Sequence, residues 1–253
     1  RSRRGHGMRL LAGVVGVAGL AVALAELDPA SQLSSGCFGL PEKGFGLQSN
    51  IAQVDADGEA VWVSRAAGDS AVDFTLYDLA GNEVTLSTLL EDKPVALIWG
   101  MWTCPAFQGL RSDYPFDQNS RWEEWDVVEK YKDVVTFLHL VGPEPHPLAP
   151  DQNFDKGYVW MESWSTVRQP TNYDERLVLA NKVAEYVHPD ATVLADLYPG
   201  NSYAAADVSS NPVWCTMGLH SRSALLVDQD GTITFSQSWF RKDDLSAAID
   251  ALV

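Results

Sequence analysis

One uninterrupted apolar run constrains the fold of this chain more than any other feature. Residues 95–99 (VALIW) are apolar at consecutive positions rather than at alternating ones. This pattern is typical of a strand buried on both faces, as in a sheet covered by helices on both sides. Residues 133–142 (DVVTFLHLVG) read as the next buried strand. We therefore expect an α/β fold built on a central mixed sheet.

The segments around these two strands predict the rest of the order. Residues 71–90 read as a strand, a turn at 80–82, a second strand and a short helix. A helix is expected from Ser120, a second over 172–188 with Thr171 as its N-cap, and a third over 242–253. Residues 191–198 read as a strand, and residues 223–239 as a hairpin turning at 228–231. This order indicates right-handed crossovers and an antiparallel edge.

The net charge excludes one class of partner. The chain has 34 acidic and 18 basic residues, for a net charge of −16. Nucleic-acid binding is not expected, because phosphates require Lys and Arg. The sequence has no zinc-ligand spacing, no Walker loop and no dinucleotide-binding glycine motif, so we expect no metal and no cofactor.

The N-terminal segment predicts a membrane anchor. Residues 1–9 hold four arginines and no acid, and residues 10–25 carry no charged or polar side chain. Sixteen residues also suit a signal peptide, and the ALA before Glu26 resembles a cleavage site. Met8 and Leu27 extend the run to a marginal span, so we expect a retained single-pass helix. Gly13, Gly16 and Gly19 would form a face that lets another membrane helix approach closely.

These features divide the chain into three parts. We expect a basic flank and anchor over 1–27, an extended Gly/Ser-rich linker over 28–67 with one strand-like piece at 59–65, and a globular domain over 68–253. The basic flank should stay on the cytoplasmic, stromal or matrix side. The acidic domain would then lie on the lumenal, intermembrane or periplasmic side, with an organellar membrane favoured and other membrane-protein subunits as partners.

The cysteines raise the question of chemistry. Cys104 follows the first buried strand and precedes Pro105, which suits the first turn of a helix. A thiolate at a helix N-terminus is stabilised by the backbone N–H groups and the helix dipole, so Cys104 is a candidate nucleophile; a small core residue is the alternative. Cys37 and Cys215, the latter in an expected loop, are either resolving partners or inert.

Several stretches in the same order carry a resemblance to a known family. Residues 71–100 resemble the opening of thioredoxin-like redoxins. Four motifs resemble the iodothyronine deiodinases, with cysteine where those enzymes have selenocysteine: residues 100–107 (GMWTCPAF), 144–147 (EPHP), 168–186 and 222–233. The resemblance covers about residues 68–253 and implies a thioredoxin-like fold.

The resemblance also assigns roles to single residues. Cys104 takes the selenocysteine position, Thr103 and Pro105 shape its turn, and His146 takes the place of a histidine that handles substrate, with Glu144 beside it. A histidine there can hydrogen bond a phenol or carry a proton. Arg222, just before the hairpin, can counter a substrate charge.

Two functions from different classes follow. The first is a membrane-anchored, deiodinase-like thiol oxidoreductase in which Cys104 attacks a halogen or a peroxide and another thiol regenerates it. The second is a non-catalytic accessory subunit of a larger photosynthetic or respiratory membrane complex. Trp102 stands where the animal deiodinases have an auxiliary cysteine. Their second histidine would fall near Pro170 and Thr171, and this chain has no histidine there. These departures favour the second function, and the intact T-C-P turn favours the first.

Overall fold

The computed structural model describes residues 65–104, 107, 120–144, 167, 170, 172–198, 211–217, 222–237 and 239–253, with the backbone of two short strands, β1 (Gln53–Val54) and β2 (Ala60–Val61). These two strands pair within the predicted linker, and β2 falls in its strand-like piece. The predicted anchor, with Gly13, Gly16 and Gly19, lies outside the described residues. Among the helices in the described part, none is long and apolar enough to span a membrane.

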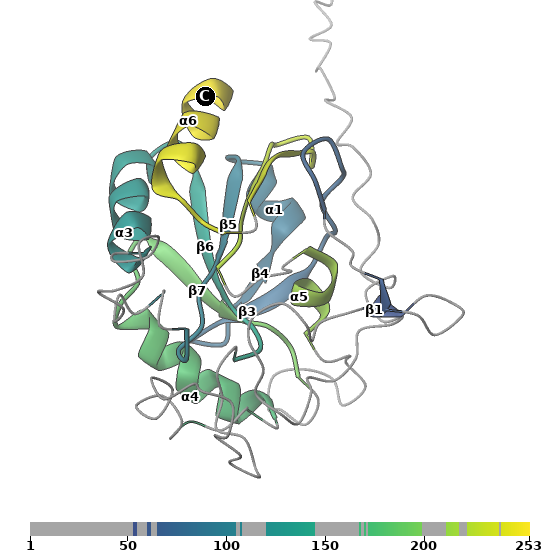
Figure 1. Ribbon diagram of the computed structural model, residues 1–253, viewed down its shortest axis with the longest axis vertical. Helices are drawn as coiled ribbons and strands as arrows, with labels where there is room; N and C mark the ends of the chain where they lie inside the picture. The colour runs from purple at the N-terminus through teal and green to yellow at the C-terminus, as the bar shows by residue number, and fades with distance from the viewer. Residues whose placement is uncertain are drawn as a thin grey trace, which may run out of the picture.

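A seven-stranded mixed sheet forms the centre of the fold (Figure 1). Its order is β4 (Glu83–Thr85), β3 (Thr75–Asp78), β7 (Ala191–Ala195), β6 (Thr136–Val141), β5 (Val95–Trp99), β8 (Ala224–Val227) and β9 (Ile233–Gln237). Strands β5, β6 and β7 are parallel, whereas β3 and β4 at one edge and β8 and β9 at the other run antiparallel to their neighbours. The mixed sheet confirms the predicted α/β class.

The central strand is buried as its sequence predicts. All five residues of β5 are buried, because β6 and β8 pair with its two edges and helices cover the sheet. β5 leads through a helical segment to β6, and the chain later returns as the β8–β9 hairpin and a final helix. This β-α-β followed by β-β-α around one central strand is the thioredoxin-like arrangement.

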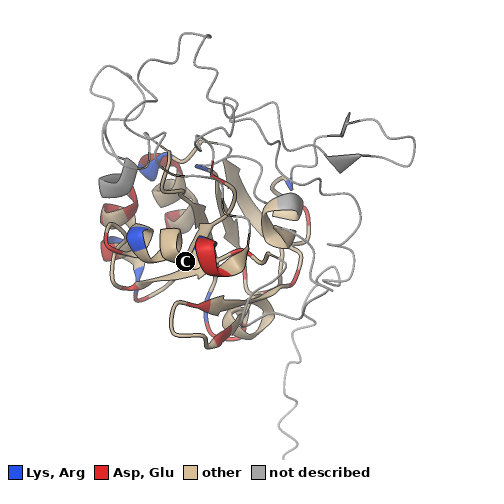
Figure 2. Ribbon diagram, turned by 90° about the horizontal axis from the view of Figure 1, so that it is seen from below, with Lys and Arg blue, Asp and Glu red and all other residues tan. Residues whose placement is uncertain are grey.

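Among the described residues, the helices around the sheet are α1 (Leu86–Leu90), α3 (Ser120–Tyr131), α4 (Tyr173–Ala184), α5 (Pro212–Met217) and α6 (Lys242–Leu252). The helices α3 and α6 lie side by side (Figure 1), and Tyr131 of α3 donates a hydrogen bond to Asp250 of α6 (2.7 Å). Figure 2 shows acidic residues spread over the described ribbon with fewer basic ones, in line with the net charge of −16.

Two local predictions are wrong. The N-cap of α4 is Asn172 rather than Thr171, because Asn172 has an extended backbone and its side chain accepts a hydrogen bond from the Glu175 N–H (2.9 Å). The segment around Cys215, expected as a loop, forms the short helix α5. Asp196 explains this helix, since its carboxylate accepts the N–H groups of Val213 (3.2 Å) and Trp214 (2.7 Å) in the first turn.

Candidate functional site

The predicted nucleophile lies in a tight turn at the end of the central strand. β5 ends at Trp99, and the backbone N–H of Cys104 donates to the carbonyl of Met101 (3.1 Å). Phe107, three residues later, is helical and buried. Cys104 therefore lies between the end of the central strand and a helical residue. Its side chain is completely buried, and so is that of Thr103.

Glu144 lies against this turn from the neighbouring strand. It follows the end of β6, is buried, and its Oε2 accepts a hydrogen bond from the Thr103 N–H (2.6 Å). Burial raises the pKa of the Glu144 carboxyl, and hydrogen bonds from Thr103 and the Trp102 backbone oppose that shift. The structure thus brings Glu144 and Thr103 together. Pro105 and His146 lie outside the described residues.

Arg222 approaches the same turn from the other side. It precedes β8, whose Ser223 carbonyl accepts the N–H of Trp99 at the end of β5 (2.9 Å). Arg222 is buried, and its guanidinium lies over the rings of Trp239 (5.5 Å) and Phe240 (5.8 Å). Burial lowers the pKa of Arg222 to about 10, and its electrostatic interaction with Cys104 opposes that shift. A buried cation therefore interacts electrostatically with the thiol.

Trp102 packs against the hydrophobic core and against the end of α4. Its ring is half-buried and contacts α4, where its centroid lies 5.6 Å from that of Tyr186, next to the helix, and 5.4 Å from the Lys182 ammonium. The bulky side chain beside Cys104 thus anchors the turn to α4.

A buried histidine beneath the turn was missed by sequence reasoning. His139 in β6 is completely buried; its Nε2 contacts the carbonyl oxygen of Gly100 (2.9 Å) and its Nδ1 contacts the carboxyl of Glu124 in α3 (2.7 Å). A carbonyl only accepts, so Nε2 is the donor in the contact with Gly100. The only sign of this site in the sequence is a histidine within an otherwise apolar strand.

A second buried polar group, also missed, lies at the ends of β6 and β7. Arg176 of α4 is completely buried and donates from Nη1 to the carbonyls of Asp196 (2.8 Å) and Leu197 (3.3 Å). Burial raises the pKa of Asp196 to about 6, opposed by Arg176 and by three backbone N–H groups. Arg176 also interacts electrostatically with Glu144, which links this group to the Cys104 turn.

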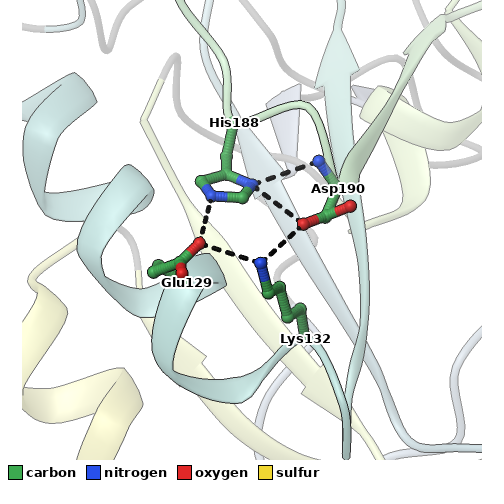
Figure 3. Close-up of polar contacts among 4 residues, drawn as sticks. All are labelled: Glu129, Lys132, His188 and Asp190. Atoms are coloured by element: carbon green, nitrogen blue, oxygen red, sulfur yellow. Dashed lines mark hydrogen bonds and ion pairs between the residues drawn. The ribbon is translucent and has the colours of Figure 1, made fainter.

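One cluster resembles a metal site in composition but already holds a cation. Ligand atoms of Glu129, His188 and Asp190 lie within 4.8 Å of one another (Figure 3). The Lys132 ammonium contacts both Glu129 and Asp190 at 2.9 Å. His188 Nδ1 accepts the Asp190 N–H (3.1 Å), and its Nε2 contacts Glu129 (2.7 Å). Lys132 thus supplies the positive charge between the two carboxylates.

The Cys104 turn thus combines a buried thiol, a buried guanidinium that interacts electrostatically with it, and a buried carboxyl group whose pKa is raised. In general, a cation can stabilise a thiolate and such a carboxyl group can exchange a proton. Cys104 forms no disulfide with another described residue. Cys37 lies outside the described residues, and so does the side chain of Cys215.

Comparison with known proteins gives likenesses of fold only. No protein-family model and no curated protein matches the chain. It is similar to the thioredoxin domain of a thiol-disulfide oxidoreductase from Bacteroides vulgatus (16% identity over 75% of this chain and 99% of that one, TM-score 0.45). It is also similar to the exposed lipoprotein thioredoxin of Streptococcus pneumoniae (19%, 72% and 100%, TM-score 0.43) and to a hypothetical protein from Sinorhizobium meliloti (16%, 75% and 85%, TM-score 0.47). Likenesses at this level identify no substrate, reductant or partner.

Proposed function

We propose that the protein is a deiodinase-like thiol oxidoreductase anchored in a membrane, with Cys104 as its nucleophile. The observation that carries this proposal is the buried Arg222 guanidinium that interacts with Cys104. Burial alone disfavours a thiolate, whereas an adjacent guanidinium favours it. If the Cys104 thiol ionises, the buried Arg222 guanidinium compensates the negative charge of the thiolate.

The reaction takes one of two forms. With a peroxide, the Cys104 thiolate attacks one oxygen, the O–O bond breaks, and an alkoxide leaves and takes up a proton while Cys104 becomes a sulfenic acid. With an aryl iodide, the thiolate takes the iodine, the carbon gains a proton, and Cys104 becomes a sulfenyl iodide. In each form two external thiols restore Cys104 and leave as a disulfide, with water or iodide as the second product.

Each neighbour of Cys104 has a part in this proposal. Arg222 stabilises the thiolate, and Glu144 holds the Thr103 N–H and so fixes the turn. Glu144 is also a candidate for delivering the proton, together with His146 as the family resemblance implies. Trp102 and Thr103 shape the turn through their contacts with α4 and Glu144.

The test is a pair of reductase assays on the full chain. Purified protein is supplied with dithiothreitol and with either hydrogen peroxide or an aryl iodide, and the loss of thiol is followed. We expect turnover with one of the two substrates, abolished by Cys104→Ser and retained by the matched variant Cys37→Ser. Equal turnover in the wild type and in Cys104→Ser would contradict the proposal.

One observation favours the second function, a non-catalytic accessory subunit of an organellar membrane complex. The Cys104 side chain has no exposed surface, whereas a reacting thiol must meet its substrate. A segment that opens over the turn reconciles burial with catalysis; a permanently buried thiol supports the accessory role.

Purification from native membranes distinguishes the two functions, because an accessory subunit co-purifies with other membrane proteins at fixed stoichiometry. Release of the intact chain by carbonate without detergent would contradict the anchor in both.

A further inference from the structure

Two nitrogens on one side of the Arg176 guanidinium, Nε and Nη2, have no hydrogen-bond partner among the described residues. Its side chain is completely buried, Nη1 donates to the carbonyls of Asp196 and Leu197, and its face lies over the Tyr198 ring (5.0 Å). The other two nitrogens, Nε and Nη2, are buried and have no hydrogen-bond partner within the described part of the chain. A buried donor without a partner destabilises the folded state, and more so when it is charged. Such an arrangement is rare in folded proteins.

Two further polar atoms near the end of β7 are in the same state. Trp214 Nε1 and Asn211 Oδ1 are buried and lack a hydrogen-bond partner among the described residues. Their backbone N–H groups donate to the Asp196 carboxylate (2.7 Å) and to the Leu197 carbonyl (2.8 Å), the two residues that also hold Arg176. Three residues tied to one dipeptide thus carry unused hydrogen-bonding capacity. This concentration indicates a binding site rather than isolated packing defects.

The shape of the empty edge selects the ligand. Nε and Nη2 form one side of the planar guanidinium and present two parallel N–H groups, which match the two oxygens of a carboxylate. The two described carboxylates that interact electrostatically with Arg176 accept their hydrogen bonds from backbone N–H groups. Asp196 accepts the N–H groups of Leu197, Val213 and Trp214, and Glu144 accepts that of Thr103.

The local charge can accommodate an added anion. The groups that interact electrostatically with Arg176 are Asp196, Tyr198, Glu144 and Tyr173. The charge of Asp196 is compensated by its three backbone donors. Burial raises the pKa of Glu144, so this carboxyl can take up a proton when a second anion binds.

We propose that the Nε–Nη2 edge of Arg176 is a subsite for the carboxylate group of a small organic molecule. The subsite lies at the carboxyl ends of the parallel strands, where open α/β sheets bind their ligands. The Cys104 turn lies at the same end of these strands. It does not require that Cys104 react, so it goes beyond the proposed function and stands or falls separately.

The test uses acetate as the probe and the Trp214 indole as the reporter. Indole N–H signals of the ¹⁵N-labelled full chain are recorded at constant ionic strength during titration with acetate, acetamide or sulfate. Trp214→Phe assigns the signal. We expect a saturable shift of that signal with acetate, none with acetamide, and at most a weak one with sulfate. Arg176→Lys, which keeps the charge but loses the two-pronged edge, should weaken acetate binding at least tenfold, whereas the exposed Arg241→Lys should not.

Several results would overturn the proposal. The absence of a saturable shift means that ordered water alone fills the edge. Equal binding in Arg176→Lys moves the site elsewhere, and equal affinity for sulfate excludes a carboxylate-specific subsite. If Arg176→Lys does not fold, the melting temperature of the wild type tests the proposal instead. A ligand that binds the native state raises this temperature, so acetate should raise it and acetamide should not.

Discussion

Replacing Gly100 with alanine should disrupt the floor of the Cys104 turn. A Cβ at this position would lie 2.6 Å from His139 Cε1, 2.8 Å from its Nε2 and 2.7 Å from Phe107 Cδ2. Gly100 does not have a positive φ, so steric overlap rather than backbone strain is the obstacle. The imidazole must then move away from the Gly100 carbonyl, to which it donates at 2.9 Å.

Two costs add in this variant. Overpacking a buried site costs about 1–3 kcal/mol, and a buried donor left without its acceptor costs about 1–3 kcal/mol. We therefore expect Gly100→Ala to lower the free energy of unfolding by roughly 2–6 kcal/mol. With an m-value of about 2 kcal/mol/M, the urea midpoint, followed by tryptophan fluorescence, should fall by about 1–3 M.

Gly142→Ala is the matched control. Its added Cβ would lie 3.2 Å from Met101 Cε and 3.3 Å from Trp214 Cε3, and the end of a methionine side chain moves easily. We expect this variant to lose less than about 1 kcal/mol. Equal stability of the two alanine variants would refute the close packing of His139 against Gly100.

Two other buried groups give predictions that stability measurements can check. Asp196 has a pKa raised to about 6, against about 3.9 when unfolded. The folded state therefore binds the additional proton between these values, and the stability that Asp196 contributes is present at low pH and is lost as the pH rises to about 6. The stability of the wild type relative to Asp196→Asn should thus fall by about 2 kcal/mol from pH 4 to 7; a constant difference would contradict the raised pKa. For Glu124, substitution by Gln should cost at most about 1 kcal/mol, because its amide can donate to His139 Nδ1, whereas Glu124→Leu should cost about 2–3 kcal/mol. The reverse order would exclude a hydrogen bond between Glu124 and His139.

The sequence was most informative where burial is continuous along the chain. The run in β5, the turn at Gly81 and the hairpin turn at Gly231, where both glycines have φ of 87°, follow from local pattern and turn chemistry. The α4 cap was wrong by one residue, because Thr171 and Asn172 are both good caps and only the backbone conformation distinguishes them.

The buried polar groups could not be predicted in the same way. His139 reads as one polar residue in an apolar strand, and Arg176 as one of several charged residues in an amphipathic helix. Their partners, Glu124 and Asp196, lie 15 and 20 residues away, and no local pattern specifies such pairs. Arg222 was expected to meet substrate charge near the hairpin, but its burial beside Cys104 depends on how β8 pairs with β5.

The central claim is that Arg222 stabilises Cys104 as a thiolate, and the pH dependence of alkylation tests it most directly. The rate is measured in the Cys37→Ser/Cys215→Ser background, so that Cys104 is the only thiol, with and without Arg222→Gln. We predict a midpoint below that of free cysteine, about 8.5, and an increase of about one unit or more in Arg222→Gln. A midpoint at or above about 8.5 with Arg222 intact, or a thiol that reacts only after unfolding, would contradict the claim.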